Sequence, residues 1–255
     1  MPADFARSAL TATGERTAPG LPDEEYWFAR HLAAYEWCAQ GLDPEAVIVD
    51  AGAGEGYGID LLPGRLRIAV DYDVAASEHL HRAYPELRAI RANLAQLPLA
   101  TGSVDAVVTL QVLEHIWDPL GFLGEVRRVL APGGHLCLTT PNRLTFSPGL
   151  ARGEKPTNPF HVEEFDPDQV RALVEHAGFA EVQVLGLHHG PRLQEWEERH
   201  GSLVAAQIAA VAAGHWDDTL RDMVSSVTSA DFVVNGDPST AADLVALARV
   251  PGERP

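Results

Sequence analysis

The chain has 255 residues, 46% of them hydrophobic, and Asp and Glu outnumber Lys and Arg by 36 to 19, which gives a net charge of −17. This length is enough for one sizeable domain with a full core. The negative charge argues against a nucleic-acid partner, because a phosphate backbone needs a basic face. The sequence has no signal-peptide core and no apolar stretch near ~20 residues, so we expect a cytoplasmic protein without membrane association.

The N-terminal part, residues 1–45, is expected to be irregular up to residue 20 and then helical from Asp23 to Gln40, with Asp23 as the N-cap. Aromatic residues are concentrated in this helix. Two interpretations remain open: the aromatics pack the helix on a sheet, or the helix also forms a lid over a binding site. The side chains that would then reach an acceptor are Tyr26, Trp27 and Arg30.

A short β-branched run, Val47 to Val49, precedes Asp50 and three glycines spaced two apart, and a helix is expected to begin at Tyr57. Glycines let the backbone turn sharply and let a ligand approach its N–H groups. The acid at position 55 disfavours a pyrophosphate but tolerates a ligand without phosphate. The pattern predicts a nucleotide-type pocket at the end of a parallel strand, formed by Gly52, Gly54 and Gly56.

Further apolar runs alternate with helical patterns, which is typical of a parallel sheet covered on both faces. We expect a mostly parallel, seven-stranded α/β sheet in a single domain, with a cofactor-binding core at 46–190, a helical insertion at 191–234, and the last strand and tail at 235–255. The predicted later strands are Leu66–Val70, Leu87–Arg91, Val104–Leu110, His135–Thr140, Ala180–Leu187 and Leu244–Val250.

The second strand ends at Asp71, where a carboxylate can accept hydrogen bonds from a ribose diol; capping of the next helix is the alternative. In that next helix we expect His79 to lie on the outer surface. Three segments are expected to wall the substrate site: the N-terminal helix, the loop at 141–166 and the insertion at 190–234. Cys38 and Cys137 are interpreted as small core residues, not a disulfide, and the Cys and His spacing predicts no metal site.

With these motifs in order, the region from Ala46 to Val184 resembles the class I S-adenosylmethionine-dependent methyltransferases, which have a Rossmann-like fold. The motifs are VDAGAGEGYG, AVDYD, ANLAQLPLATGSVDAVV, VLEHIWDP and RRVLAPGGHLCLTTPN. The family often has an acid where Asn93 stands, and an amide can still bond an adenine amino group. The resemblance implies S-adenosylmethionine as cofactor, bound by Asp50, Gly52, Gly54, Gly56, Asp71, Tyr72, Asn93, Leu94 and Gln111.

A narrower resemblance covers GERTAPG, EEYWFARH, NPFH and GLHHGPRL, which look like segments of the actinobacterial sugar O-methyltransferases of methylmannose and methylglucose polysaccharide biosynthesis. It implies O-methylation of a sugar or short oligosaccharide. The alternatives are another hydroxylated metabolite, such as a quinone or polyketide, or a non-catalytic cofactor-binding protein. A homodimer is compatible with either function.

Methyl transfer to a hydroxyl needs alignment of donor and acceptor and a group that takes the proton. His161, in a proline-rich loop, is the first candidate for that base, and His115 with Glu114 is the second. His188 and His189 are adjacent and point in different directions, which disfavours a shared metal. The predicted acceptor contacts are Tyr26, Trp27, Arg30, Tyr57, His188 and His189.

Overall fold

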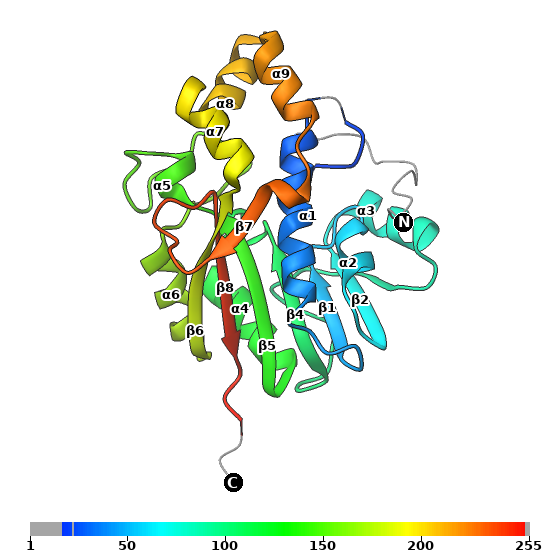
Figure 1. The fold of residues 1–255 in the computed structure, drawn as a ribbon. Helices are drawn as coiled ribbons and strands as arrows, with labels where there is room; N and C mark the ends of the chain where they lie inside the picture. Colours follow the sequence, from blue (N-terminus) through cyan, green and yellow to red (C-terminus); the bar gives the residue numbers. More distant parts are fainter. Residues whose placement is uncertain (1–16, 22, 253–255) are drawn as a thin grey trace.

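The computed structural model describes residues 17–21 and 23–252 of the chain, and the start of the GERTAPG motif lies outside them. One eight-stranded sheet runs through the molecule in the order β3-β2-β1-β4-β5-β8-β6-β7 (Figure 1). The strands are β1 Val47–Ala51, β2 Leu66–Asp71, β3 Arg88–Arg91, β4 Val104–Leu110, β5 Leu130–Pro141, β6 Ala180–His189, β7 Phe232–Asn235 and β8 Asp243–Arg249.

The sheet is mixed. Strands β1 to β5 pair in parallel, whereas β8 lies antiparallel between β5 and β6, and β7 pairs antiparallel with β6. The Rossmann-like arrangement is confirmed, but the prediction of seven strands is wrong. The additional strand β7 is a β-prone Phe-Val-Val run. It extends the sheet by pairing with the end of β6, a long-range contact that local periodicity does not reveal.

Helices cover both faces of the sheet, and each face has its own apolar core. Strand β1 illustrates the division, since Ile48 faces the core with α1, α2 and α3, and Val49 faces the core with α4 and α6. The helices are α1 Glu25–Ala39, α2 Tyr57–Leu61, α3 Val74–Ala83, α4 Pro119–Val129, α5 Arg143–Phe146, α6 Pro167–His176, α7 Pro191–His200, α8 Leu203–Ala213 and α9 Asp218–Ser225.

The insertion after β6 forms α7, α8 and α9, as expected, and then the turn η2 (Ser229–Asp231) leads into β7. In Figure 1 these helices stand above the end of the sheet at which β6 leads into α7. That end also holds the carboxyl ends of the parallel strands, because β6 runs parallel to β5. The insertion therefore stands over the expected ligand side. Within the described residues, no helix is long and apolar enough to cross a membrane.

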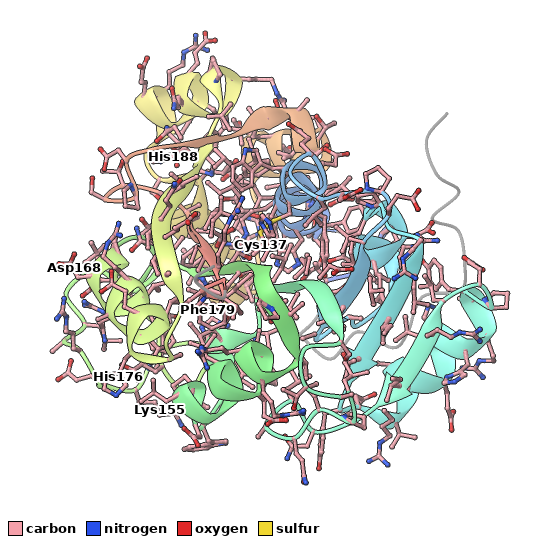
Figure 2. The ribbon with its side chains drawn as sticks, turned by 90° about the horizontal axis from the view of Figure 1, so that it is seen from below. Cys137, Lys155, Asp168, His176, Phe179 and His188 are labelled. Atoms are coloured by element: carbon pink, nitrogen blue, oxygen red, sulfur yellow. A yellow bond between two sulfur atoms is a disulfide. The ribbon has the colours of Figure 1, made fainter. Side chains whose placement is uncertain are left out.

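Three local predictions are wrong. Cys38 in α1 and Cys137 in β5 form a disulfide, with their Cα atoms 6.7 Å apart (Figure 2, where Cys137 is labelled near the centre). The prediction failed because 99 residues separate the two cysteines. Asp23 does not cap α1; its φ is 64°, and its carboxylate contacts Arg221. His79 is buried, because it turns inward to Glu55, 3.5 Å away.

Candidate functional site

The glycine turn after β1 has the backbone that the spacing predicted. Gly52, Gly54 and Gly56 have φ values of 91°, 50° and 82°, in the region that favours glycine. A Cβ on Gly52 would lie 2.3 Å from the Val112 side chain. The turn thus packs closely against the segment after β4, and glycine is required for this approach. The following helix α2 has only five residues, so it contributes little helix dipole.

A cleft of about 630 Å³ lies between this turn and the segments that follow β2, β3 and β4. Seven of the nine predicted cofactor residues line it: Gly52, Gly54, Asp71, Tyr72, Asn93, Leu94 and Gln111. The others that line it are Asp73, Ala95, Val112, His115, Ile116, Trp117 and Asp118. The cleft has a volume suited to a nucleoside-sized ligand, and its carboxylates suit a ligand that carries a cation and no phosphate.

Asp71 ties the second strand to the glycine turn. Its Oδ2 accepts a hydrogen bond from the Gly54 N–H at 2.8 Å, and its Oδ1 accepts one from the Asp73 N–H at 2.8 Å. Since each carboxylate oxygen has two lone pairs, both oxygens retain capacity for a ribose hydroxyl. Asp73, through its own side chain, caps α3. Asp71 therefore does not cap α3 through its own side chain; its position at the cleft agrees with the ribose assignment.

The remaining two predicted cofactor residues, Asp50 and Gly56, lie beneath the cleft and do not line it. The Asp50 carboxylate is fully buried and accepts a hydrogen bond from the Tyr35 hydroxyl at 3.1 Å. Burial raises the pKa of Asp50 to about 7. A Cβ on Gly56 would lie 2.5 Å from Leu80. Asp50 thus contacts α1, and Gly56 packs against α3.

Gln111 connects the cleft to a buried polar group behind it. Its backbone has a φ of 56°, and its side chain donates to Thr139 Oγ1 at 3.1 Å and accepts from Arg30 at 3.3 Å. The Arg30 guanidinium pairs with Asp243 at 3.3 Å and lies 5.0 Å from the centre of the Trp27 ring. Two predicted acceptor residues, Arg30 and Trp27, thus lie directly behind the cofactor cleft.

Asp243 was not predicted to belong to this group. It begins β8, and because β8 runs antiparallel, its first residue lies at the same edge as the carboxyl ends of the parallel strands. Burial raises the pKa of Asp243, and the positive charge of Arg30 opposes that shift. A single acid at the start of an apolar strand was the signal that could have identified it.

The other predicted acceptor residues lie farther into the walls. Tyr57 contacts His31 Nδ1 through its hydroxyl at 3.2 Å, and burial lowers the pKa of His31 to about 3. The Tyr26 hydroxyl lies 2.7 Å from His189 Nε2, in the core between α1 and β6. His188 Nε2 contacts the Asp237 carbonyl oxygen, in the segment between β7 and β8. None of these side chains lines the cofactor cleft.

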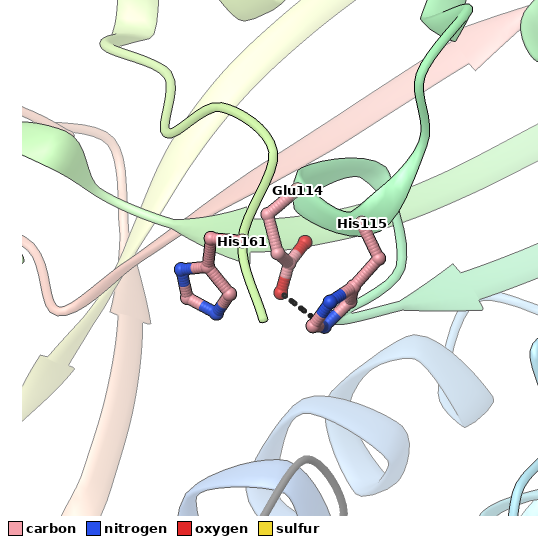
Figure 3. A group of neighbouring side chains, drawn as sticks. All are labelled: Glu114, His115 and His161. Atoms are coloured by element: carbon pink, nitrogen blue, oxygen red, sulfur yellow. Dashed lines mark ion pairs between the residues drawn. The ribbon is translucent and has the colours of Figure 1, made fainter. Parts of the chain in front are cut away.

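The three predicted catalytic residues come together at the side of the cleft (Figure 3). Glu114 and His115 lie in the turn η1 (Leu113–His115), and His161 comes from the loop before α6. One ligand atom from each of the three lies within 4.8 Å of the other two. The rings of His115 and His161 are 5.1 Å apart, and His115 lines the cleft. The cluster therefore adjoins the expected methyl donor.

Glu164, which lies near His161 in the sequence, and Thr140, which the sequence did not reveal, hold this cluster. Glu164 Oε1 lies 2.7 Å from His161 Nδ1, and Thr140 donates to Glu114 Oε2 at 3.0 Å. Burial raises the pKa of Glu114 to about 7, and the nearby His161 opposes that shift. The acid at position 164, three residues after His161, was a visible signal for an imidazole partner. The contact of Thr140 depends on the pairing of β4 with β5.

Comparisons with known proteins agree on the class of this site. Residues 49–138 match a family model described as a methyltransferase domain. The chain is 46% identical to a probable S-adenosylmethionine-dependent methyltransferase of Mycobacterium tuberculosis, covering 94% of this chain and 90% of the relative. A probable S-adenosylmethionine-dependent methyltransferase of Mycolicibacterium smegmatis is 45% identical, with 94% and 95% covered.

More distant relatives and solved structures extend the comparison. A ubiquinone biosynthesis O-methyltransferase of Dinoroseobacter shibae is 27% identical over 58% of this chain and 66% of the relative. Among solved structures, a possible histamine N-methyltransferase of Thermotoga maritima superimposes with a TM-score of 0.59 at 20% identity, covering 89% of this chain and 94% of that chain. The structural match supports the fold alone.

Proposed function

The chain belongs to the S-adenosylmethionine-dependent methyltransferases, and on that premise we propose that it methylates a hydroxyl of a sugar or short oligosaccharide. The class of enzyme and the cofactor follow from the relatives. The acceptor is our inference, and it rests on the side chains beside the cofactor cleft. The observation that carries it is the polar character of that neighbourhood, described below.

The described residues fit S-adenosylmethionine. Gly52 and Gly54 line the cleft without a Cβ, so a ligand can approach the main chain there, and the acids at the cleft suit a sulfonium cation without phosphate. We assign the glycine turn to the methionine part, Asp71 to the ribose, and Asn93 with Leu94 to the adenine. Gln111 then lies near the methyl group.

The acceptor side is charged and rich in hydrogen-bonding groups. Glu114, His115 and His161 lie at one wall of the cleft, and Arg30 with Asp243 lies behind Gln111. Carboxylate, imidazole and guanidinium groups can bond the many hydroxyls of a sugar, whereas an apolar ring offers them no hydrogen-bonding partner. This arrangement favours a polyhydroxylated acceptor.

When bound, S-adenosylmethionine supplies an electrophilic methyl group, and its sulfur keeps the electron pair of the broken S–CH₃ bond. The residues of this chain align the acceptor oxygen and take its proton as the O–CH₃ bond forms. We assign removal of that proton to the Glu114–His115–His161 cluster. Within it, His161 is oriented by Glu164, a carboxylate–imidazole pair suited to proton transfer.

A panel of acceptors tests the proposal. We expect transfer of labelled methyl from S-adenosylmethionine to mannosides or glucosides, and no transfer to deoxy analogues that lack the reactive hydroxyl. Failure to methylate any sugar in a panel that varies anomer, chain length and prior O-methylation would overturn the proposed acceptor.

A quinol hydroxyl is the second candidate, favoured by the 27% identity to a ubiquinone biosynthesis O-methyltransferase. Exposed apolar side chains near the cleft, Trp117 and Phe160, would suit such a ring. Catechols and hydroquinones included in the same panel distinguish the two, since methylation of a quinol with all sugars inert would select this candidate.

A further inference from the structure

We propose that Glu114, His115 and His161 bind one divalent transition-metal cation, of the Mn²⁺ or Zn²⁺ type, at the wall of the cofactor cleft. Nothing in the spacing of the Cys and His residues predicts this site. Two of its ligands, Glu114 and His115, are adjacent in the chain, and the third is more than forty residues away. The fold alone brings them together.

The first argument is convergence. The three ligand atoms lie within 4.8 Å of one another, and Glu114 Oε1 is 3.9 Å from His115 Nε2. Ligands held at ~2.1 Å from one cation lie ~3–3.5 Å apart. Each separation must therefore shorten by no more than about 2 Å to reach that spacing. Figure 3 shows the carboxylate between the two imidazoles, with all three side chains directed into the same space.

The second argument is the hydrogen bonding of the imidazoles. Nδ1 of His115 lies 3.0 Å from the Phe160 carbonyl oxygen, which can only accept, so this nitrogen carries the proton. Nδ1 of His161 lies 2.7 Å from Glu164 Oε1, and Asn158 donates its amide N–H to Nε2 of His161 at 3.0 Å. The proton of His161 is therefore also on Nδ1. Both histidines present Nε2 as the basic nitrogen, the pattern that oxygen partners impose on metal-binding histidines.

The carboxylate is held in a corresponding way. Thr140 donates to Glu114 Oε2, and the side chain of Glu114 is 1% exposed. The main-chain carbonyl of Glu114 accepts the Val162 N–H at 2.7 Å, which fixes the His161 loop against η1. Main-chain and side-chain contacts thus orient the two ligand segments toward each other before any cation binds.

The donor set indicates which cation fits. Two imidazoles and one carboxylate suit Mn²⁺, Fe²⁺, Co²⁺ or Zn²⁺, whereas Mg²⁺ and Ca²⁺ prefer oxygen ligands. Three protein ligands leave coordination positions open for other groups. The cation would replace the Asn158 amide at His161 Nε2, and Asn158 lies in the same loop as His161.

The role of the cation rests on the proposed function. Two neighbouring hydroxyls of a sugar can occupy the open positions, and ligation lowers the pKa of the reactive hydroxyl. In the cation-bound enzyme His161 acts as a ligand instead of taking the proton itself, and the proton of the bound hydroxyl passes to water. The negative oxygen attacks the methyl carbon, and no other reactant is needed.

Cation binding is measured on the full chain, treated with EDTA and freed of the chelator, without cofactor or acceptor. We expect titration with Mn²⁺ to give one bound ion per chain. The titration is monitored by calorimetry and by the loss of the electron paramagnetic resonance signal of free Mn²⁺. Glu114→Gln, His115→Ala and His161→Ala should each weaken binding at least ~10-fold. The control is His176→Ala, an exposed histidine at the end of α6.

No Mn²⁺, Co²⁺ or Zn²⁺ binding by the wild type, or equal binding by all variants, would overturn the site. Circular dichroism identifies a variant that does not fold, and His115→Ala, at a partly exposed side chain, then provides the decisive comparison. The metal site and the proposed function are tested separately. If the enzyme binds Mn²⁺ but methylates no hydroxyl, the site stands and the proposed function is wrong. If it methylates sugars at full rate in EDTA, the proposed function stands and the cation has no part in it.

Discussion

At the residue scale, the glycine turn and the Glu114–His115–His161 cluster are held in place in different ways. Gly52 and Asp71 have roles that follow from local geometry, a turn and the end of a strand, so their spacing identifies them. The environment of His161 depends on Glu164 and Asn158 in a folded loop, and that of Glu114 depends on Thr140 in another strand. A residue whose partner comes from another strand cannot be assigned from its own segment.

Removing the imidazole of His161 should impair turnover and spare the cofactor. We expect His161→Ala to lower kcat at least ~100-fold, because the cluster to which removal of the acceptor proton is assigned loses one of its three side chains. The affinity for S-adenosylhomocysteine should stay within about twofold, since the described contacts of His161 lie outside the glycine turn. Kinetics and calorimetry test this. An unchanged kcat would remove His161 from the catalytic cluster.

The pKa of Asp50 predicts a pH-dependent stability. Its ordinary value of 3.8 is raised to about 7 by burial, so the folded chain holds the proton more tightly than the unfolded chain does. This stabilisation is complete below pH ~4 and is lost as the pH rises toward 7. Asp50→Asn keeps an acceptor for the Tyr35 hydroxyl. As the pH rises from 4 to 7, the free energy of unfolding of Asp50→Asn should therefore increase relative to that of wild type, by ~1.4 kcal/mol per pH unit.

Urea unfolding of both proteins at several pH values measures that difference. A constant difference between them across the range would contradict the assigned shift, because only a group with different folded and unfolded pKa values produces a slope.

At the element scale, boundaries were predicted well where the sequence marks them. Helix α6 begins at Pro167 after the Asp166 capping box and ends at His176, two residues before Gly178, which are visible start and stop signals, and β4 has the predicted limits. The short strand β7 was missed, since a four-residue run has too little periodicity to separate it from a helix end. Prediction failed at elements whose only support is pairing with distant strands.

The glycine turn allows a matched pair of substitutions. At Gly52 an alanine must adopt a φ of 91° and its Cβ must displace Val112, which lines the cleft. We expect Gly52→Ala to weaken S-adenosylhomocysteine binding at least ~10-fold. Gly102, with a φ of 65° and open space around it, is the control for backbone strain alone. Equal affinities in the two variants would mean that the close contact with Val112 does not shape the cleft.

At the scale of the whole molecule, two long-range features complete the fold. One is the antiparallel β8, which brings Asp243 to the ligand edge. The other is the disulfide between Cys38 and Cys137, which joins the helix behind the acceptor side to the centre of the sheet. The succession of strands along the chain was recognisable from the motifs, but their order in the sheet was not predicted, and neither of these contacts leaves a local pattern.

The disulfide should stabilise the chain by restricting its unfolded state. A cross-link across 99 residues is expected to contribute ~2–4 kcal/mol, so Cys38→Ser should lower the free energy of unfolding by about that amount under oxidising conditions. Both cysteines line a cavity of about 440 Å³, through which a small thiol can reach them. Urea unfolding with and without dithiothreitol tests this. If Cys38→Ser has a lower free energy of unfolding than the reduced wild type as well, the loss of stability comes from packing and not from the missing cross-link.

The loop that carries His161 is fastened at its ends by main-chain contacts: Val162 to Glu114, Arg143 to Phe165, and the bridge between Asn142 and Phe165. Such bonds do not depend on which side chains the loop carries. The segment between them, apart from His161, can therefore be exchanged as a unit while the cofactor cleft stays intact. For protein engineering, acceptor preference becomes a property that can be grafted from one member of the family to another.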